Sequence, residues 1–325
     1  MTIGVGIIGF GFMGRTHAAA YEAAANTGFD CRVVAVADPR GKETATDAAA
    51  VRDAAVYTTA EELLADERVR LVSICTYTDT HAPLAAAALK AGKHVLVEKP
   101  VALTSDVVRS LRDEAAAHPG LVCIPAMCMR FWPGWDWLAA RIKDGSLGAV
   151  RSATFTRLSA GPAWGGAFYG DHARSGGALV DLHIHDADFV LHVFGEPGGV
   201  ASTGNTTHVT TLYRFRHGPA HVAAEGAWDL SPAAGFRMRF LVNFEHGTAE
   251  FDLSRTPSLV LHTATGTELV RLEQGTGYDG EVRHTLNVIA GKDRPRATLD
   301  DALAVARILE AERASLEQGG RLISL

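Results

Sequence analysis

The first 38 residues constrain the fold more than any other stretch, because two short apolar segments flank a glycine-rich turn and an alanine-rich segment. Residues 3–8 and 32–37 have the length and composition of buried strands, and the stretch up to Ala25 is typical of a helix. The turn between the first strand and the helix reads Gly9-Phe10-Gly11-Phe12-Met13-Gly14. This order of elements predicts a parallel α/β domain that binds a dinucleotide.

The three glycines of this turn have different predicted roles. Gly9 allows the tight turn, Gly11 lets the main chain approach a pyrophosphate, and Gly14 permits close packing of the helix. The spacing alone is a weak signal in a chain with 33 glycines, so the flanking strand and helix carry the prediction. We expect all six residues of the turn to contact the cofactor.

Asp38, at the end of the second strand, indicates which cofactor is used. An acidic side chain at this point accepts hydrogen bonds from the adenosine ribose and repels a 2′-phosphate, which favours NAD. Arg40 leaves NADP open, because its guanidinium can neutralise that phosphate or stack on adenine. A solvated turn residue is the other interpretation of Arg40.

Strand and helix patterns alternate up to residue 126. Further strands are expected at 56–57, 71–75, 94–97 and 121–126, separated by helices near 42–52, 60–65, 83–90 and 105–117. We therefore expect a dinucleotide-binding domain over residues 1–125 and a second, substrate-binding domain over residues 126–325.

The segment 93–100 reads Lys-His-Val-Leu-Val-Glu-Lys-Pro, a buried strand that ends in a charged pair before a proline. Ligands of parallel sheets bind outside the carboxyl ends of the strands, so Glu98 and Lys99 would contact the cofactor there. A surface lysine at an ordinary strand end is the alternative. The loop after the preceding strand reaches the same edge, and its candidates to line the dinucleotide, rather than merely to pack, are Thr76, Tyr77 and His81.

Beyond residue 126 the chain changes to long segments of alternating apolar and polar residues. They are typical of a large, mainly antiparallel sheet, and they lie at 150–159, 208–217, 220–230, 236–243, 248–253 and 258–273. The outer face of such a sheet needs solvent or a second subunit, so we expect a homodimer or homotetramer through it. Three nearby tryptophans indicate a sealed core or, alternatively, a sugar-stacking surface: Trp132, Trp135 and Trp137.

The segment 176–194 predicts one helix that is apolar except for a polar stripe. The stripe consists of Asp181, His185, Asp188 and His192. Asp181 and His185 lie one turn apart, so the carboxylate would fix the imidazole as an acid/base group. A satisfied polar seam and a metal site are alternatives, with Asp186 as a solvated neighbour; because no other cluster completes a ligand shell, no metal is expected.

Taken in order, these motifs resemble the Gfo/Idh/MocA family, named for glucose-fructose oxidoreductase, inositol dehydrogenase and rhizopine catabolism. The resemblance covers nearly the whole chain. It is carried by Gly9-x-Gly-x-x-Gly14, Asp38, the segment 91–100 with its Glu-Lys-Pro ending, Arg130-Phe-x-Pro133, Gly176-Gly-x-x-x-Asp181-x-x-x-His185 and the tail from Asp300.

The resemblance implies a Rossmann domain followed by a mainly antiparallel α/β domain. It also implies a nicotinamide cofactor and hydride transfer at a hydroxyl-bearing carbon of a sugar, polyol or cyclitol. Lys99 and His185 would transfer the proton and Asp181 would orient His185, all three in contact with the substrate. His183 stands where the family often has glycine, which leaves the substrate type open. Further candidates for the wall of the cleft are Trp164, Arg157 and Tyr278.

Two other functions stay open at this point. A tightly held NAD could assist glycoside cleavage or elimination without net redox change, or the chain could be a dinucleotide-sensing regulator without turnover. The sensor explains poorly why an Asp/His stripe interrupts an apolar helix.

The net charge and the cysteines indicate which classes of binding partner and which cellular compartment to expect. A net charge of -6 and a pI near 6.2 give no electrostatic footprint for nucleic acid or an anionic membrane. The four cysteines form no CxxC pair, and no apolar run is long enough to span a bilayer. We expect a cytoplasmic protein with a small-molecule substrate.

Overall fold

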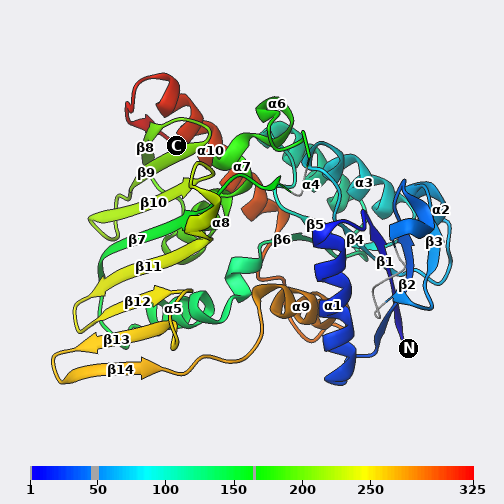
Figure 1. Ribbon diagram of the computed structural model, residues 1–325, viewed down its shortest axis with the longest axis horizontal. Helices are drawn as coiled ribbons and strands as arrows, with labels where there is room; N and C mark the ends of the chain where they lie inside the picture. The colour runs from blue at the N-terminus through cyan, green and yellow to red at the C-terminus, as the bar shows by residue number, and fades with distance from the viewer. Residues whose placement is uncertain (1, 45–50, 164–165) are drawn as a thin grey trace. The chain divides into compact units, whose positions relative to one another are not determined.

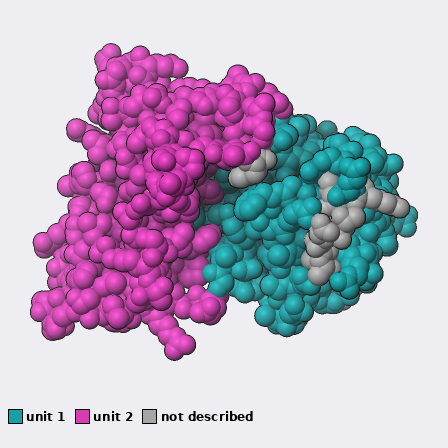
Figure 2. Space-filling model, viewed as in Figure 1, with its two compact units in different colours: residues 1–131, 275–303 teal, residues 132–274, 304–325 magenta. Residues whose placement is uncertain are grey.

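The computed structural model describes residues 2–44, 51–163 and 166–325. The chain forms two compact units (Figure 2). Unit 1 comprises residues 1–131 and 275–303, and unit 2 comprises residues 132–274 and 304–325. The segment 275–303, which the sequence pattern assigns to the second domain, thus belongs with the first.

Unit 1 is built on a six-stranded parallel sheet, which confirms the predicted dinucleotide-binding fold. Its strands, in spatial order, are β3 (Ala55–Tyr57), β2 (Cys31–Ala37), β1 (Ile3–Ile8), β4 (Leu71–Ile74), β5 (His94–Glu98) and β6 (Cys123–Ala126). The central strands are apolar on both sides and almost wholly buried, as parallel strands covered by helices must be. The strand order reverses between β1 and β4, and ligands of open α/β sheets bind at such a reversal.

Most of the helices of unit 1 connect these strands, and the others follow the last of these strands along the chain (Figure 1). They are α1 (Phe12–Asn26), η1 (Gly41–Thr44), α2 (Ala60–Leu64), α3 (Thr78–Lys90), α4 (Ser105–Ala116), η3 (Cys128–Phe131) and α9 (Gly277–Ile289), followed by the start of α10 (Leu299–Glu317). The helix expected over 42–52 is described only in part: residues 41–44 form one short 3-10 turn, and residues 45–50 lie outside the described residues.

Helix α9 joins unit 1 although it lies far along the chain. It packs against α1, beside which it is drawn in Figure 1. A capping box begins it, because the Thr276 hydroxyl accepts from the Asp279 N–H and the Asp279 carboxylate accepts from the Thr276 N–H. The buried face of α9 includes Glu281, Val282 and Leu286. A carboxylate is thereby brought into the interior of unit 1.

Unit 2 is built on a nine-stranded mixed sheet, which confirms the predicted large, mainly antiparallel sheet. Its strands, in spatial order, are β14 (Gly266–Val270), β13 (Leu259–Thr263), β12 (Thr248–Asp252), β11 (Arg237–Phe244), β7 (Val150–Leu158), β10 (His221–Ala227), β9 (His208–Arg214), β8 (Gly199–Gly204) and β15 (Ile323–Ser324). All neighbouring pairs are antiparallel except β7 with β10. Strand β8 has no counterpart among the predicted segments.

An aromatic core fills the inner side of this sheet. Trp135 on α5 (Pro133–Asp144) is fully buried, and its ring centroid lies 5.0 Å from that of Phe240 and 4.7 Å from that of Phe251. Phe189 on α8 (Ile184–Phe194) packs edge-on against Trp135 and Phe155. Trp135 therefore seals a core, as the first interpretation of the tryptophans holds. The remaining helices of unit 2 are α6 (His172–Ser175), α7 (Gly177–Asp181), η5 (Pro232–Ala234) and the rest of α10.

The opposite face of the sheet carries exposed apolar side chains. The strand register places Leu212, Ala223, Thr154 and Leu241 side by side in one row across β9, β10, β7 and β11. Leu212 is 46% exposed and Leu241 is 41% exposed, so this row is partly apolar. Among the described residues, no helix has both the length and the apolar composition that crossing a membrane requires.

Candidate active site

The glycine turn has the geometry that a dinucleotide needs. Gly9 adopts a φ of +85°, which favours glycine, and a Cβ there would approach the Cys75 carbonyl oxygen to 2.7 Å. A Cβ on Gly14 would collide with the Gly9 carbonyl oxygen, so helix α1 packs directly on the turn. A Cβ on Gly11, by contrast, would meet nothing within 4 Å. Open space therefore lies where a pyrophosphate would approach the main chain, and the turn fits NAD.

Asp38 is tied to the glycine turn and to Arg40. Its carboxylate accepts from the Phe10 N–H at 2.9 Å and from the Arg40 main chain and guanidinium at 2.9–3.0 Å. Burial alone would raise the pKa of Asp38, but the hydrogen bonds from Arg40 and Phe10 lower it below its ordinary value. The carboxylate is thus ionised near neutral pH. Arg40 is 60% exposed and rests on Asp38, the residue predicted to bind ribose.

The loop after β4 reaches the same sheet edge through His81. This histidine is buried, and its ring nitrogens lie 2.8 Å from the Pro100 carbonyl oxygen and 3.0 Å from the Thr76 carbonyl oxygen. His81 therefore connects the loop that contains Thr76 to the turn after Lys99. Tyr77 is 46% exposed at the amino end of α3, where it is available to a ligand.

Lys99 directly follows β5, as predicted, whereas the side chain of Glu98 is buried in unit 1. The Glu98 carboxylate is 3.0 Å from Nε2 of His17, and its second oxygen accepts from the Lys99 N–H at 3.0 Å. Burial alone would raise the pKa of Glu98. The hydrogen bond from His17, together with cationic neighbours that include Lys99, outweighs burial and lowers it.

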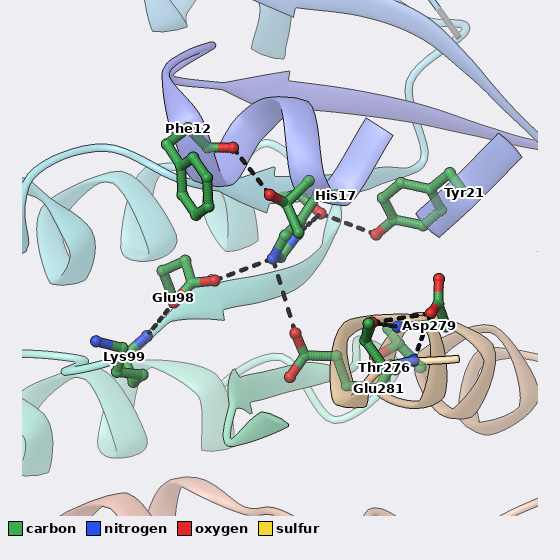
Figure 3. Close-up of polar contacts among 11 residues, drawn as sticks. Phe12, His17, Tyr21, Glu98, Lys99, Thr276, Asp279 and Glu281 are labelled. Carbon is green, nitrogen blue, oxygen red and sulfur yellow. Dashed lines mark hydrogen bonds and ion pairs between the residues drawn. The ribbon is translucent and has the colours of Figure 1, made fainter. Parts of the chain in front are cut away.

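Sequence reasoning missed two residues that complete this buried group, His17 and Glu281. Figure 3 shows the carboxylates of Glu98 on β5 and Glu281 on α9 both pointing toward His17 on α1. Nε2 of His17 lies 3.8 Å from a carboxylate oxygen of Glu281. His17 follows the glycine turn by three residues on the helix face that packs inward, which was the available signal. Nothing local to Glu281 indicates that α9 joins unit 1.

The predicted single helix over 176–194 is two helices. Helix α7 ends at Asp181 and α8 begins at Ile184, with a tight turn in which the His183 N–H donates to the Ala178 carbonyl oxygen at 2.8 Å. The expectation that Asp181 and His185 share one continuous helix is therefore wrong. Both side chains are half-buried and lie in unit 2.

His183 lies in the turn between the two helices, and its side chain is paired inside unit 2. Its side chain is fully buried, 3.1 Å from the Glu312 carboxylate and 3.2 Å from the Tyr213 hydroxyl. Burial alone would lower the pKa of His183, but the charge of Glu312 and the hydrogen bond to it raise the pKa above 6.5.

Asp186 and Arg157 form a buried ion pair, so the interpretation of Asp186 as a solvated neighbour is wrong. Asp186 is fully buried and Arg157 is 3% exposed. The guanidinium binds the carboxylate in bidentate fashion, with N···O distances of 2.9 Å and 3.0 Å. Arg157 is thereby committed to the interior of unit 2. Among the other wall candidates, Tyr278 lies in α9, and Trp164 lies outside the described residues.

Three known proteins illustrate what the chain is similar to. Inositol 2-dehydrogenase of Rhizobium meliloti (strain 1021) is 34% identical over 62% of this chain, and the chain spans a little over half, 58%, of that relative's length. UDP-N-acetylglucosamine 3-dehydrogenase of Acidithiobacillus ferrooxidans is 28% identical over 94% of each chain. The crystal structure of GenD2 from gentamicin A biosynthesis, in complex with NAD, is 27% identical, with a TM-score of 0.83, over 100% of this chain and 96% of that one.

Family models match both parts of the chain. Residues 3–124 match the model described as "Oxidoreductase family, NAD-binding Rossmann fold", and residues 135–265 match the GFO/IDH/MocA C-terminal domain. The first match covers the sheet of unit 1 with its glycine turn and Lys99, and the second covers most of the sheet of unit 2. The chain therefore belongs to the Gfo/Idh/MocA family of oxidoreductases, with an NAD-binding Rossmann fold in its first part.

Proposed function

We propose that this protein is an NAD-dependent dehydrogenase that oxidises or reduces a hydroxyl-bearing carbon of a sugar, polyol or cyclitol. One observation carries the proposal: Lys99 follows β5 at the sheet edge where the glycine turn and Asp38 also lie, so a proton-transferring amine adjoins a dinucleotide site. The relatives named above, which act on inositol and on a nucleotide sugar by their names, support this substrate class.

Different residues of unit 1 would bind different parts of NAD. The glycine turn and the amino end of α1, which no side chain caps, would receive the pyrophosphate. Asp38 would accept from the adenosine ribose once the exposed Arg40 moves aside, and its negative charge favours NAD over NADP. When bound, the nicotinamide supplies the hydride acceptor or donor.

Side chains of this protein would accept and return the proton of the substrate hydroxyl. In the oxidation direction the neutral amine of Lys99 takes the proton of the substrate hydroxyl, and in reduction the ammonium returns it. His185 would bind the same hydroxyl group or share its proton, with Asp181 as its orienting partner. Residues from both sequence halves are therefore required for turnover.

Replacing either proposed proton-transfer residue tests the function. Lys99→Ala and His185→Ala should each lower kcat by about 10²–10⁴-fold, the usual scale for loss of a general acid/base, with little change in NAD affinity. Lys90→Ala is the matched control, because Lys90 is an exposed lysine on α3 whose ammonium pairs with Glu114. Turnover is followed by NADH and NADPH absorbance with a panel of inositols, sugars and nucleotide sugars.

Three outcomes of this panel would contradict the proposal. Full activity of the Lys99 or His185 variant removes that residue from the mechanism. Product formation without net NADH indicates glycoside cleavage or elimination assisted by bound NAD. NAD binding without turnover of any panel member indicates a sensor.

We also propose that the protein self-associates through the outer face of the unit 2 sheet. The exposed row of Leu212, Ala223, Thr154 and Leu241 supports this, because a partly apolar, regular surface is suited to a second copy. A homodimer or homotetramer is expected by light scattering, and a monomer at working concentration would contradict it.

A further inference from the structure

The polar contacts around His17 can all be satisfied by one neutral tautomer. Its Nε2 faces the Glu98 carboxylate, which as an ionised acid only accepts, so Nε2 donates. Its Nδ1 lies 3.2 Å from the Ser73 hydroxyl, which in turn lies 2.8 Å from the Tyr21 hydroxyl. The Tyr21 hydroxyl can donate to Ser73 and the Ser73 hydroxyl to Nδ1 of His17. Every polar hydrogen in this series of hydrogen bonds then has one acceptor when His17 is neutral.

Glu281 is placed differently from Glu98. It is 1% exposed, and neither of its carboxyl oxygens has a hydrogen-bond partner among the described residues. An ionised carboxylate in that setting would be costly, and a second one near Glu98 more so. Burial first, and then the charge of Glu98, raise the pKa of Glu281 well above 4.5. Two glutamates in one site thus have opposite protonation states.

The same site adjoins Lys99. Glu98 accepts from the Lys99 N–H, and the two side-chain charges interact strongly enough to help lower the pKa of Glu98 after burial and His17 are counted. An ionised carboxylate therefore binds the main chain of the residue whose amine is proposed to transfer the proton. Other titratable groups that interact electrostatically with the two glutamates are Tyr21, Cys75 and His81. Burial raises the pKa of Tyr21 and of Cys75, so both are neutral.

We propose that Glu98 is a positioning residue for Lys99. In the cluster of His17, Glu98 and Glu281, His17 and Glu281 are neutral and the Glu98 carboxylate carries the single negative charge (Figure 3). This carboxylate orients the Lys99 peptide and favours the ammonium form of Lys99. The part that concerns Lys99 rests on the proposed dehydrogenase function. The part that concerns Glu281 does not.

The effect on Lys99 is tested by three glutamate-to-glutamine variants and a pH profile. Oxidation requires the neutral amine, so removing the Glu98 charge should shift the acidic limb of kcat/KM against pH to lower pH, by about one pH unit in Glu98→Gln. Glu281→Gln, which removes no charge, should shift it much less. Glu114→Gln is the matched control, because Glu114 makes a 3.0 Å contact with His118 on the surface of unit 1 and should leave the limb in place.

Two results of this profile overturn the positioning role. The first is an acidic limb that does not move in Glu98→Gln, and the second is an equal shift in Glu281→Gln. A loss of activity without any shift of the limb would likewise reduce Glu98 to a structural residue, because misfolding alone changes the amount of active enzyme and not its pH profile.

The protonation of Glu281 is tested without activity. A pKa that folding raises contributes stability below 4.5 that is lost as pH rises toward the raised value. The folding equilibrium constant of the wild-type protein relative to Glu281→Gln should therefore fall about tenfold per pH unit above pH 4.5. Hydrogen exchange of peptides from α1 and α9 measures this equilibrium constant in both proteins. If the stability difference between the wild-type protein and Glu281→Gln does not change with pH, the proposal that Glu281 is a neutral acid is wrong.

A metal would give a different result. His17, Glu98 and Glu281 each offer a ligand atom, and these atoms lie within 4.8 Å of one another. One equivalent of a divalent cation in the purified protein, lost in Glu281→Gln, would require an ionised Glu281 and overturn the proposal. If the wild-type protein turns over no substrate, the dehydrogenase function and the positioning of Lys99 fail together, whereas the stability measurement still decides the state of Glu281.

Discussion

Each unit of the molecule contains a buried histidine paired with a glutamate, and the two pairs differ in their neighbours. Nε2 of His17 lies 3.0 Å from Glu98 in unit 1, and Nε2 of His183 lies 3.1 Å from Glu312 in unit 2. In unit 2 the Tyr213 hydroxyl donates to Glu312 at 2.9 Å. In unit 1 a second carboxyl group, Glu281, lies near the histidine instead.

This difference decides where the charge resides. Burial lowers the pKa of His183, but the charge of Glu312, the hydrogen bond to it and the charge of Asp186 outweigh burial and raise the pKa, so the pair in unit 2 favours a protonated histidine. With two carboxyl groups, the proton is held by Glu281, and the cluster in unit 1 keeps one negative charge. Similar histidine–glutamate distances therefore do not imply similar electrostatics. The neutral pair is suited to structure, and the charged cluster is suited to acting on Lys99.

The largest effect should come from removing the charge in unit 2. Glu312→Gln leaves a buried, protonated histidine without its counter-charge, so unit 2 should lose about 3–5 kcal/mol of stability. Glu281→Gln in unit 1 should cost much less at neutral pH, because it replaces a neutral acid by a neutral amide. The tryptophans among the described residues all lie in unit 2, so urea unfolding followed by tryptophan fluorescence reports Glu312→Gln. Equal losses in the two variants would remove the distinction between the clusters.

A smaller effect should distinguish the clusters by pH. Folding raises the pKa of His183 above 6.5, so its contribution is complete below pH 6.5 and is lost as pH rises through the raised value. Stability relative to His183→Gln should fall by about 1.4 kcal/mol per pH unit in that window. The corresponding loss from Glu281 begins near pH 4.5. If tryptophan-monitored unfolding shows the loss beginning below pH 6, His183 is not the group that titrates.

How far the sequence predicts these features depends on how local their causes are. The glycine turn, Asp38 and Lys99 are predictable, because each lies at a strand end that is visible as an apolar run. The break after Asp181 is not predictable from the sequence, because the apolar and polar spacing over 176–194 fits one continuous helix. Strand β8 was missed because its Gly199, Ser202 and Gly204 have low strand propensity.

The return of α9 to unit 1 is the least local of these features. Its sequence has the apolar spacing of any amphipathic helix, and that spacing does not specify which sheet or helix it packs on. The carboxylate of Glu281 reaches His17 only through this tertiary contact. The charged cluster therefore depends on chain topology, whereas the residues predicted to bind the cofactor depend on short segments.

The smallest effect should come from the two tyrosine hydroxyls. Tyr213 donates to a carboxylate, Glu312, whereas Tyr21 is bonded to the neutral Ser73 hydroxyl at 2.8 Å. Hydrogen bonds to charged groups contribute about 1.5–3 kcal/mol and neutral ones about 1 kcal/mol, so Tyr213→Phe should destabilise its unit about twice as much as Tyr21→Phe. Tryptophan fluorescence measures the first and hydrogen exchange of α1 the second. A larger loss in Tyr21→Phe would mean that the Ser73–His17 contacts carry charge, and that His17 rather than Glu281 holds the proton.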